Sequence, residues 1–249
     1  MMDGEGRFSI SPRNLYSRLG TEQAPIIIDV RRSPGFDADD TIIVGAIRRL
    51  PAEVDHWQRE LPRGRPVVVY CAHSQEVSQN AAETQRISGI EASYLEHGIS
   101  GWTELGLPRR RKLSAPSGKW VTRERPKIDR IACPWLIRCF IDPEALFLFA
   151  PTERVFVIAA ETGATAYDIP GAEPFSHDGE LCSFDAFLKV YAIADPALDA
   201  LALIVRGADT ARAEVDRFTI SFDGRQLFTA QDIPLPDREK WDFGRKPTA

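Results

Sequence analysis

The fold of the first half of this chain is decided by the stretch Pro66-Val67-Val68-Val69-Tyr70-Cys71-Ala72-His73-Ser74-Gln75-Glu76-Val77-Ser78. Its apolar, mostly β-branched opening shows no polar alternation, which is typical of a strand buried on both faces. The strand places Cys71 at its carboxyl end, and a short polar loop leads from there into a helix predicted over 77–88. Unpaired N–H groups of such a loop and of the first helical turn favour a thiolate and hold an anion. The position suits a small buried core cysteine equally well.

The composition is that of an ordinary globular protein. The chain has 249 residues, which is enough for two modest domains. Of these residues, 43% are hydrophobic and 27% are charged. A net charge of −5 excludes a molecule that as a whole neutralises a nucleic-acid backbone. The four cysteines form no CxxC pair, which argues against a disulfide framework or a zinc ribbon and favours a reducing compartment. No apolar run is long enough to span a membrane, so we expect a cytoplasmic protein with no membrane partner.

Strands and helices alternate through the first half. Strands are predicted at 25–31, 45–47 and 91–95, and helices at 12–19, 51–61 and 98–105. This order predicts an α/β domain with a mainly parallel sheet flanked by helices. Ligands of such sheets lie beyond the carboxyl ends of the strands, where Cys71 falls and where Asp29 and Arg31 end another buried strand.

These elements contain phrases that resemble a rhodanese-like domain over about residues 8–108. The resemblance implies a parallel sheet in which Cys71 accepts a sulfane sulfur as a persulfide, as the nucleophile of a sulfurtransferase. It also implies a small oxyanion or a sulfane-sulfur donor as the partner, bound by the loop Ala72, His73, Ser74, Gln75, Glu76 and Val77 together with Asp29 and Arg31. The matching phrases are Asp29-Val30-Arg31, Gly45-Ala46-Ile47, Tyr70-Cys71, Ala81-Ala82, Leu95-Glu96-His97-Gly98-Ile99-Ser100-Gly101-Trp102 and Gly106-Leu107-Pro108.

The loop departs from that family in two ways. Counted from Cys71 to the Ala81-Ala82 pair, it is one residue longer than in sulfur-transferring members and resembles loops that hold tetrahedral oxyanions. Those loops end in arginine, whereas Glu76 and Val77 stand here. A carboxylate disfavours a bound dianion, whereas a protonated His73 favours one. We therefore do not expect phosphatase chemistry, and an active and an inactive rhodanese module both stay open.

A basic connector separates the two halves. Residues 114–118 within it have the composition of a flexible linker, so we expect a rhodanese-like domain over 1–112, a linker over 113–118 and a second domain over 119–249. The connector could contact DNA phosphates, or it could be a solvated linker with ordinary surface charge. Its basic residues are Arg109, Arg110, Arg111, Lys112, Lys119, Arg123, Arg125, Lys127 and Arg130.

The second half opens on a helical pattern. Apolar residues at 128, 131, 132, 135, 136, 139 and 140 predict a helix whose buried face includes Cys139 and excludes Asp129, Cys133 and Ile137. Pro134 allows either a continuous kinked helix or a helix that starts there, with Cys133 as its N-cap. Strands are predicted at 146–149 and 155–160, helices from 183 to 191 and from 195 to 205, and a hairpin at 218–224 with 227–229.

A polar cluster in this half suggests a metal. His177, Glu180 and Cys182 offer an imidazole, a carboxylate and a thiol, groups that bind borderline or soft metals. One stretch supplies at most two or three ligands, so Asp129, Cys133 or Glu161 would complete the shell. The candidate cofactor is therefore a divalent metal ion. The alternative is that a helix begins at 182–183 and the imidazole bonds the backbone.

Long, rare strings in the second half resemble the carboxyl-terminal domain of the ChrB family of bacterial chromate-resistance operons, over about residues 119–210. The resemblance implies a second α/β or α+β domain and a part in chromate or oxyanion response. Two functions stay open: sulfur and oxyanion handling through Cys71, or a chromate-responsive regulator that binds DNA through the connector and has an inactive rhodanese module. A third possibility is an interaction module whose cysteines are inert. Beyond Ala211 the chain departs from the family. The matching strings include Trp120-Val121-Thr122-Arg123, Asp129-Arg130-Ile131-Ala132-Cys133-Pro134-Trp135-Leu136, Phe175-Ser176-His177 and Gly179-Glu180-Leu181-Cys182-Ser183-Phe184.

Overall fold

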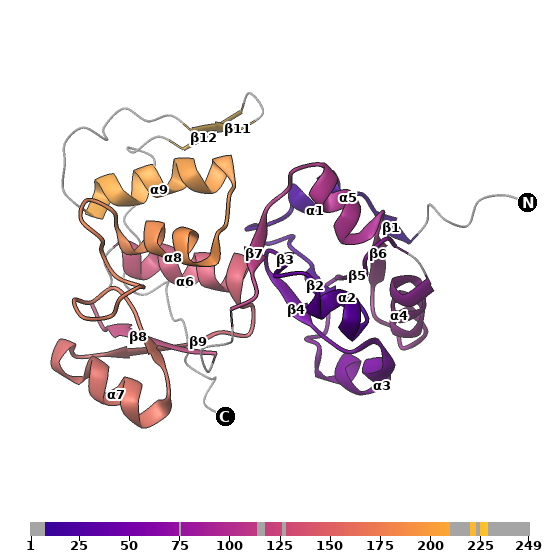
Figure 1. Cartoon of the computed structure of the whole chain (residues 1–249), viewed down its shortest axis with the longest axis horizontal. Coiled ribbons are helices and arrows are strands. Elements are labelled where there is room, and N and C mark those ends of the chain that lie inside the picture. The colour runs from indigo at the N-terminus through magenta and orange to yellow at the C-terminus, as the bar shows by residue number, and fades with distance from the viewer. Residues whose placement is uncertain are drawn as a thin grey trace, which may run out of the picture. The chain divides into compact units, whose positions relative to one another are not determined.

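The structure is a computed structural model that describes residues 8–74, 76–113, 118–125, 128–209, 220–222 and 225–228 (Figure 1). The chain divides into two compact units, Met1–Asp195 and Pro196–Ala249. The domain bounds expected from the sequence stay a prediction, and residues 114–117 of the expected linker lie outside the described residues. Across the described ranges, every helix is too short or too polar to cross a membrane.

Among the described residues, five strands form a parallel sheet in the order β1-β6-β5-β2-β4. All four residues of the central strand β5 are buried, as expected for a strand covered on both faces. The strand predicted before Cys71 is therefore confirmed, and so is the α/β fold class. The strands are β1 (Ser9–Ile10), β6 (Ala92–Leu95), β5 (Val67–Tyr70), β2 (Ile26–Asp29) and β4 (Ala46–Arg48).

Helices cover both faces of this sheet (Figure 1). On one face, α1 (Pro12–Tyr16) and α5 (Gly98–Glu104) pack on a core that includes Tyr70 and Trp102. On the other face, α3 (Val54–Trp57) and α4 (Glu76–Ile87) pack on a core that includes Trp57 and Cys71. Because side chains alternate between the faces of a strand, Tyr70 and the next residue belong to opposite cores. Cys71 therefore lies on the α4 side of the sheet.

Short elements complete this half of the unit. Helix α2 (Ser33–Asp37) follows β2, and 3-10 turns at Pro51–Glu53 and Gln58–Glu60 flank α3. Strand β3 (Thr41–Ile43) pairs antiparallel with β7 (Arg109–Arg111), the first part of the basic connector. The connector therefore begins as a paired strand and not as free chain.

In the described part of the second half, three strands form a parallel sheet in the order β10-β8-β9. Helix α8 (Ser183–Tyr191) packs beside this sheet through aromatic side chains: the ring of Trp120 lies 5.2 Å from that of Phe175 and 5.3 Å from that of Phe187. The inward face predicted for α8 is confirmed, since Phe184 and Phe187 are fully buried. The strands are β8 (Lys119–Arg123), β9 (Leu146–Ala150) and β10 (Thr165–Ala166).

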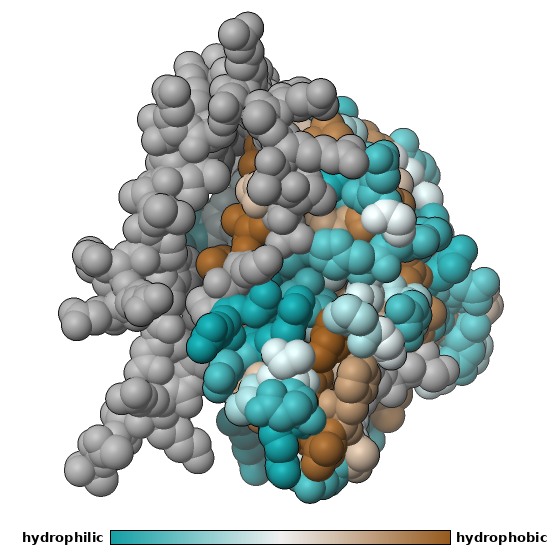
Figure 2. All heavy atoms as spheres, turned by 90° about the vertical axis from the view of Figure 1, so that its left-hand side faces the viewer, coloured by the Kyte–Doolittle hydropathy of each residue, from teal (hydrophilic) through white to brown (hydrophobic). Residues whose placement is uncertain are grey.

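The strand predicted over 155–160 is wrong. After a 3-10 turn at Thr152–Arg154, these residues form helix α7 (Val155–Thr162), which ends at Gly163 with a φ of 70°. Helix α7 connects β9 to β10, and parallel strands of one sheet need such a crossover. A short apolar run fits either element, so only the sheet topology decides. The side chains of Phe156 and Val157 remain 45% and 41% exposed. Figure 2 views the molecule from the left-hand side of Figure 1 and shows brown, hydrophobic surface at the level where α7 lies.

The helix around Pro134 is continuous. Helix α6 (Asp129–Leu136) contains Pro134 in its interior and runs into a π-helical turn, Ile137–Ile141, so Cys133 is not an N-cap. The predicted buried face is wrong in part, although Leu136 and Phe140 are buried as expected. Asp129, Cys133 and Ile137 are fully buried, whereas Ile131 is exposed. Asp129 bonds within the molecule, and this buried polar contact overrides the apolar pattern.

The second unit contains helix α9 (Pro196–Asp209) and the strands β11 (Ile220–Phe222) and β12 (Arg225–Phe228). The two strands pair antiparallel, so the predicted hairpin is confirmed for these residues.

Candidate functional site

Cys71 follows β5 directly, and its thiol faces the start of α4. The Sγ atom lies 3.2 Å from Oγ of Ser78, the third residue of this helix. The N-terminal turn of a helix holds the positive end of the helix dipole, so a negative charge on sulfur is favoured there. Cys71 is 6% exposed and belongs to the apolar cluster that includes Val69 and Ala82. The position therefore combines the two surroundings that the sequence left open, a packed core and a helix N-terminus.

The loop after Cys71 presents polar groups to solvent. His73 and Glu76 are exposed, Ala72 and Val77 are half-buried, and Gln75 lies outside the described residues. Ser74, also half-buried, has a φ of 59°. The loop therefore carries two ionisable side chains at the surface.

Backbone hydrogen bonds fasten this loop to α5. The N–H groups of Ile99 and Ser100 donate to the carbonyl oxygens of Cys71 and Ala72, at 3.0 and 3.1 Å. Gly98 makes this approach possible, because its φ is +58° and a Cβ there would lie 2.4 Å from the carbonyl oxygen of Cys71. Gly98 therefore permits the close contact between the two backbones.

Asp29 and Arg31, expected at the substrate site, lie in a buried network. Nε and Nη2 of Arg31 donate to Asp29 Oδ2 at 2.9 and 2.7 Å, and its Nη1 donates to Asp39 at 2.8 Å. The hydroxyl of Tyr70 donates to Asp29 Oδ2 at 3.0 Å. Burial and the charge of Asp29 raise the pKa of Tyr70 well above its ordinary value. The network ties the carboxyl ends of β2 and β5 together, and Thr41 accepts a further bond from Arg31 through its carbonyl oxygen.

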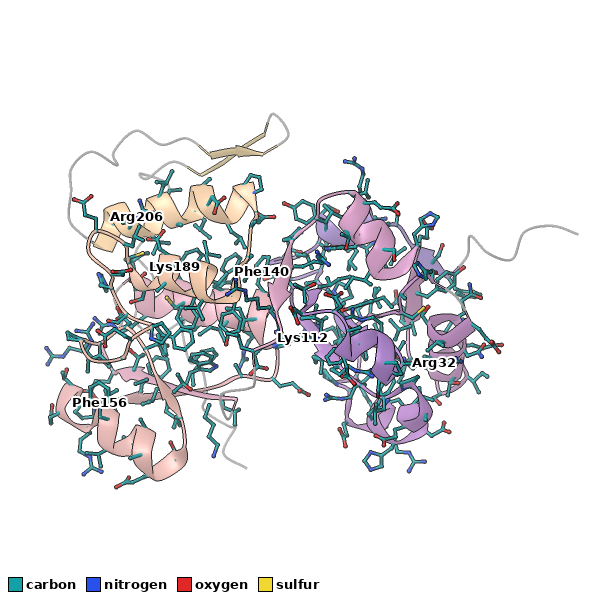
Figure 3. The ribbon with its side chains drawn as sticks, in the orientation of Figure 1. Arg32, Lys112, Phe140, Phe156, Lys189 and Arg206 are labelled. Carbon is teal, nitrogen blue, oxygen red and sulfur yellow. The ribbon has the colours of Figure 1, made fainter. Side chains whose placement is uncertain are left out.

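The neighbouring residue, Arg32, is the one that lines a pocket. This pocket has a volume of about 300 Å³ and lies between the segment 51–54 and the first half of α4. Arg32 is exposed and labelled in Figure 3, and Val77 and Ala81 also line the pocket. Since both of these α4 residues pack in the cluster of Cys71, the pocket borders the thiol's own core. In the sequence, the one feature that could have pointed to Arg32 is its position directly after the predicted strand that ends at Arg31.

The first arginines of the basic connector already have protein partners. Arg109 lies 3.8 Å from Asp39, and Arg110 donates to the carbonyl oxygens of Arg111 and Ala46 at 3.2 and 3.4 Å. Burial lowers the pKa of Arg110. Lys112 donates to the carbonyl oxygen of Phe36 and lies over its ring. These side chains serve the packing of β7.

A second polar site forms where α6, the segment after β10 and the segment before α8 meet. Asp129, Asp168 and His177 each turn one ligand atom toward the others, and these atoms all lie within 4.8 Å of one another. His177 Nε2 is 3.4 Å from Asp129 Oδ2 and 3.5 Å from Asp168 Oδ1. Both aspartates are buried, and the His177 side chain is 39% exposed. The three groups form a buried acid pair with an imidazole at its surface.

Ser183, at the start of α8, binds both acids. Its N–H donates to Asp129 Oδ2 at 2.9 Å, and its hydroxyl donates to Asp168 Oδ1 at 3.1 Å. The other oxygen of Asp168, Oδ2, lies 2.9 Å from Arg130 Nε and 3.1 Å from Arg123 Nη2. Both arginines belong to the basic connector, and both form ion pairs with a buried carboxylate of the protein itself.

The remaining metal candidates of the sequence lie apart from this group. Cys182 is the N-cap of α8 and forms a capping box with Asp185, which confirms the alternative that a helix begins here. Burial and the charge of Asp129 raise the pKa of Cys182, so its thiol stays protonated. Cys133 is fully buried and Glu180 is exposed, and neither belongs to the group of three ligand atoms. All four cysteines lie in the described ranges and are free thiols.

Comparison with known proteins agrees with this architecture. A family model described as a rhodanese-like domain matches residues 11–105, and one described as the ChrB C-terminal domain matches residues 120–225. The chain joins a rhodanese-like domain to a ChrB C-terminal domain. Both resemblances in the sequence are thereby confirmed, but the departure expected beyond Ala211 is wrong as far as residue 225, where the ChrB match ends.

Relatives match parts of the chain. ChrB of Cupriavidus metallidurans is 33% identical over 145 residues, which are 57% of this chain and 42% of that protein. An uncharacterized protein of Synechocystis is 30% identical over 109 residues, 43% of this chain and 59% of that protein. The chain thus spans less than two thirds of the length of either relative. A solved rhodanese-related protein of Thermoplasma volcanium is 28% identical with a TM-score of 0.36, and the match covers 41% of this chain and 96% of that one.

Proposed function

We propose that the rhodanese-like domain transfers sulfane sulfur through Cys71, in the chromate or oxyanion response to which ChrB-type proteins belong. The observation that supports this proposal best is the thiol at the carboxyl end of the central strand, 3.2 Å from Ser78 in the first turn of α4. Ligands of parallel sheets bind at that edge. The reaction suits a reducing cytoplasm, in which free thiols persist.

The transfer needs a sulfur donor with a bond that Cys71 can cleave, and thiosulfate is such a donor. The Cys71 thiolate attacks the outer sulfur of thiosulfate, the sulfur–sulfur bond of thiosulfate breaks, and sulfite leaves with the bonding electron pair. The persulfide formed on Cys71 then gives its outer sulfur to a nucleophile such as cyanide, which becomes thiocyanate and returns the thiolate. The exposed Arg32 in the neighbouring pocket would attract the anionic donor.

The test is a thiosulfate:cyanide assay on the full chain, combined with cyanolysis of protein-bound sulfur. We expect Cys71→Ser to abolish both signals. Cys139→Ser is the matched control, because Cys139 is another free thiol, whose pKa is raised by burial. Unchanged turnover in Cys71→Ser would exclude this mechanism, whereas the control must keep full activity.

A DNA-binding regulator is the second candidate, since the connector is basic. The structure argues against a role of three of its arginines in DNA binding, because a guanidinium that already bonds to protein groups is not available to phosphates. These arginines are Arg110, Arg123 and Arg130. Binding to the promoter fragment of its own operon, measured at several salt concentrations, separates the candidates. A steep loss of affinity with salt, together with an inactive Cys71, would favour the regulator.

A further inference from the structure

We propose that Asp129, Asp168 and His177 bind one divalent zinc ion in the ChrB C-terminal domain. The proposal concerns a different site from Cys71 and does not depend on sulfur transfer. Two buried carboxylates and one imidazole from three separate segments converge there, with their ligand atoms within 4.8 Å of one another. Zn²⁺ accepts this donor set of one nitrogen and two oxygens.

The spacing of the donors suits a tetrahedral ion. A tetrahedral centre with metal–ligand bonds near 2.1 Å separates neighbouring donors by ~3.4 Å. His177 Nε2 lies 3.4 Å from Asp129 Oδ2 and 3.5 Å from Asp168 Oδ1. A tetrahedral ion bound between these atoms would replace the direct ion pairs of the imidazole with the two carboxylates.

Ser183 fixes the two acids in this arrangement. Its N–H and its hydroxyl bind Asp129 Oδ2 and Asp168 Oδ1, the same two oxygens that face His177. A residue that orients ligand oxygens in this way is the usual support of a metal centre. Ser183 is fully buried at the first position of α8, so its two donors have a fixed direction.

The arginines of the site do not occupy the ligand positions. Arg123 and Arg130 contact Oδ2 of Asp168, whereas Oδ1 turns toward His177. A carboxylate that binds an arginine through one oxygen and a metal through the other is held rigidly. Because His177 is 39% exposed on its side chain, an ion and a water molecule can reach the fourth position from solvent.

The thiols of the same region are less suited to the ion. The sulfur atoms of Cys133 and Cys182 do not belong to the group of ligand atoms that converge here. In addition, the sulfur of Cys182 accepts the capping bond of α8. We therefore place the ion on oxygen and nitrogen donors.

The experiment titrates the full chain, freed of metal, with Zn²⁺ by calorimetry and with Co²⁺ by visible spectroscopy. We expect one Zn²⁺ per chain, and intense visible bands of four-coordinate Co²⁺ without a thiolate charge-transfer band. His177→Ala should weaken Zn²⁺ binding more than ~100-fold, and Ser183→Ala by roughly 10-fold to 100-fold. His56→Ala is the matched control, since His56 is exposed and also lies beside a carboxylate, 3.7 Å from Glu60.

Each outcome decides the proposal. His177 lies at the surface, so its replacement should leave the fold intact by circular dichroism, and lost binding in a folded variant supports the site. Equal Zn²⁺ binding by His177→Ala and the natural chain would overturn it. A strong thiolate band with Co²⁺, or no stoichiometric Zn²⁺ binding at all, would overturn it as well.

Discussion

The thiol of Cys71 and the hydroxyl of Ser78 lie 3.2 Å apart, across the loop that joins β5 to α4. This contact links the first residue after a buried strand to the third residue of the following helix. Ser78 is fully buried, so its hydroxyl has no competing solvent. If Cys71 is the sulfur acceptor, this hydroxyl donates to the thiolate and to the persulfide.

Replacing Ser78 by alanine tests that contact. A hydrogen bond to a charged group contributes about 1.5–3 kcal/mol, so Ser78→Ala should lower kcat/KM of the thiosulfate:cyanide reaction by roughly 10-fold to 100-fold. The control is Ser88→Ala, an exposed serine beyond the end of α4. Equal rates in Ser78→Ala and the natural chain would show that the contact serves packing alone.

Gly98→Ala should disturb the loop through its backbone. The new Cβ would meet the carbonyl oxygens of Cys71 and Ala72 at 2.4 and 2.7 Å, in addition to the strain of a positive φ. Gly106 also has a positive φ but nothing within 4 Å of its Cβ position. We expect Gly106→Ala to lower the free energy of unfolding by about 1 kcal/mol and Gly98→Ala by at least ~1 kcal/mol more. Urea unfolding measures both, and similar losses would contradict the close contact.

Arg32→Ala tests the pocket beside α4. If Arg32 attracts an anionic donor, its loss should raise KM for thiosulfate several-fold and leave kcat nearly unchanged, since the charge acts on binding. The increase should shrink at high salt, because an exposed charge is screened. Arg63→Ala, an exposed arginine before β5, is the control. A pocket unrelated to the reaction would give the two variants the same KM.

Asp168→Asn should be far more destabilising than Asp178→Asn. Asp168 is buried and forms ion pairs with Arg123 and Arg130, so its neutral variant leaves the buried guanidinium of Arg130 and the half-buried one of Arg123 without this counter-charge. Breaking a buried pair costs roughly 3 kcal/mol, whereas an exposed pair contributes at most about 1 kcal/mol. Asp178 pairs at 3.1 Å with Lys189, labelled in Figure 3, and both side chains are exposed. Denaturant unfolding distinguishes the variants, and comparable losses would mean that the buried network is not ionic.

The lowered pKa of Asp39 predicts that the free energy of unfolding depends on pH. Burial alone would raise its pKa, but hydrogen bonds from Thr41 and the charge of Arg31 lower it below its ordinary value. A lowered pKa in the folded state stabilises the protein above the unfolded pKa, near ~3.9, and this contribution is lost as pH falls through the folded value. The difference in unfolding free energy between the natural chain and Asp39→Asn should therefore be constant from pH 7 to about 4 and shrink below that. A difference that grows on acidification would contradict the assignment.

The sequence predicted the first sheet well, because buried parallel strands are continuous apolar runs and turn residues separate them. It also placed Cys71 at a strand end from the polar residues that follow Tyr70. It wrongly predicted a strand at 155–160, because an apolar run of that length fits a strand and a helix alike. The decision came from the parallel pairing of β8 with β9 and β10, which requires a crossover.

Candidate site residues show the same division. His177 was recognisable as a ligand type, but its partner Asp168 was not, since eight residues of irregular chain lie between them and only the fold brings them within 3.5 Å. The sequence predicted that Arg31 binds substrate, but in the structure its guanidinium group pairs with Asp29 and Asp39.

The sequence by itself therefore determined which residues can do chemistry, where the buried strands lie and which two families the halves resemble, since these follow from local pattern and residue type. Only the tertiary structure decided which charges are used internally, which acids meet the imidazole and which face of α6 is buried. Such contacts join segments far apart in the chain, and the free energy of burying and pairing polar groups depends on their partners in space.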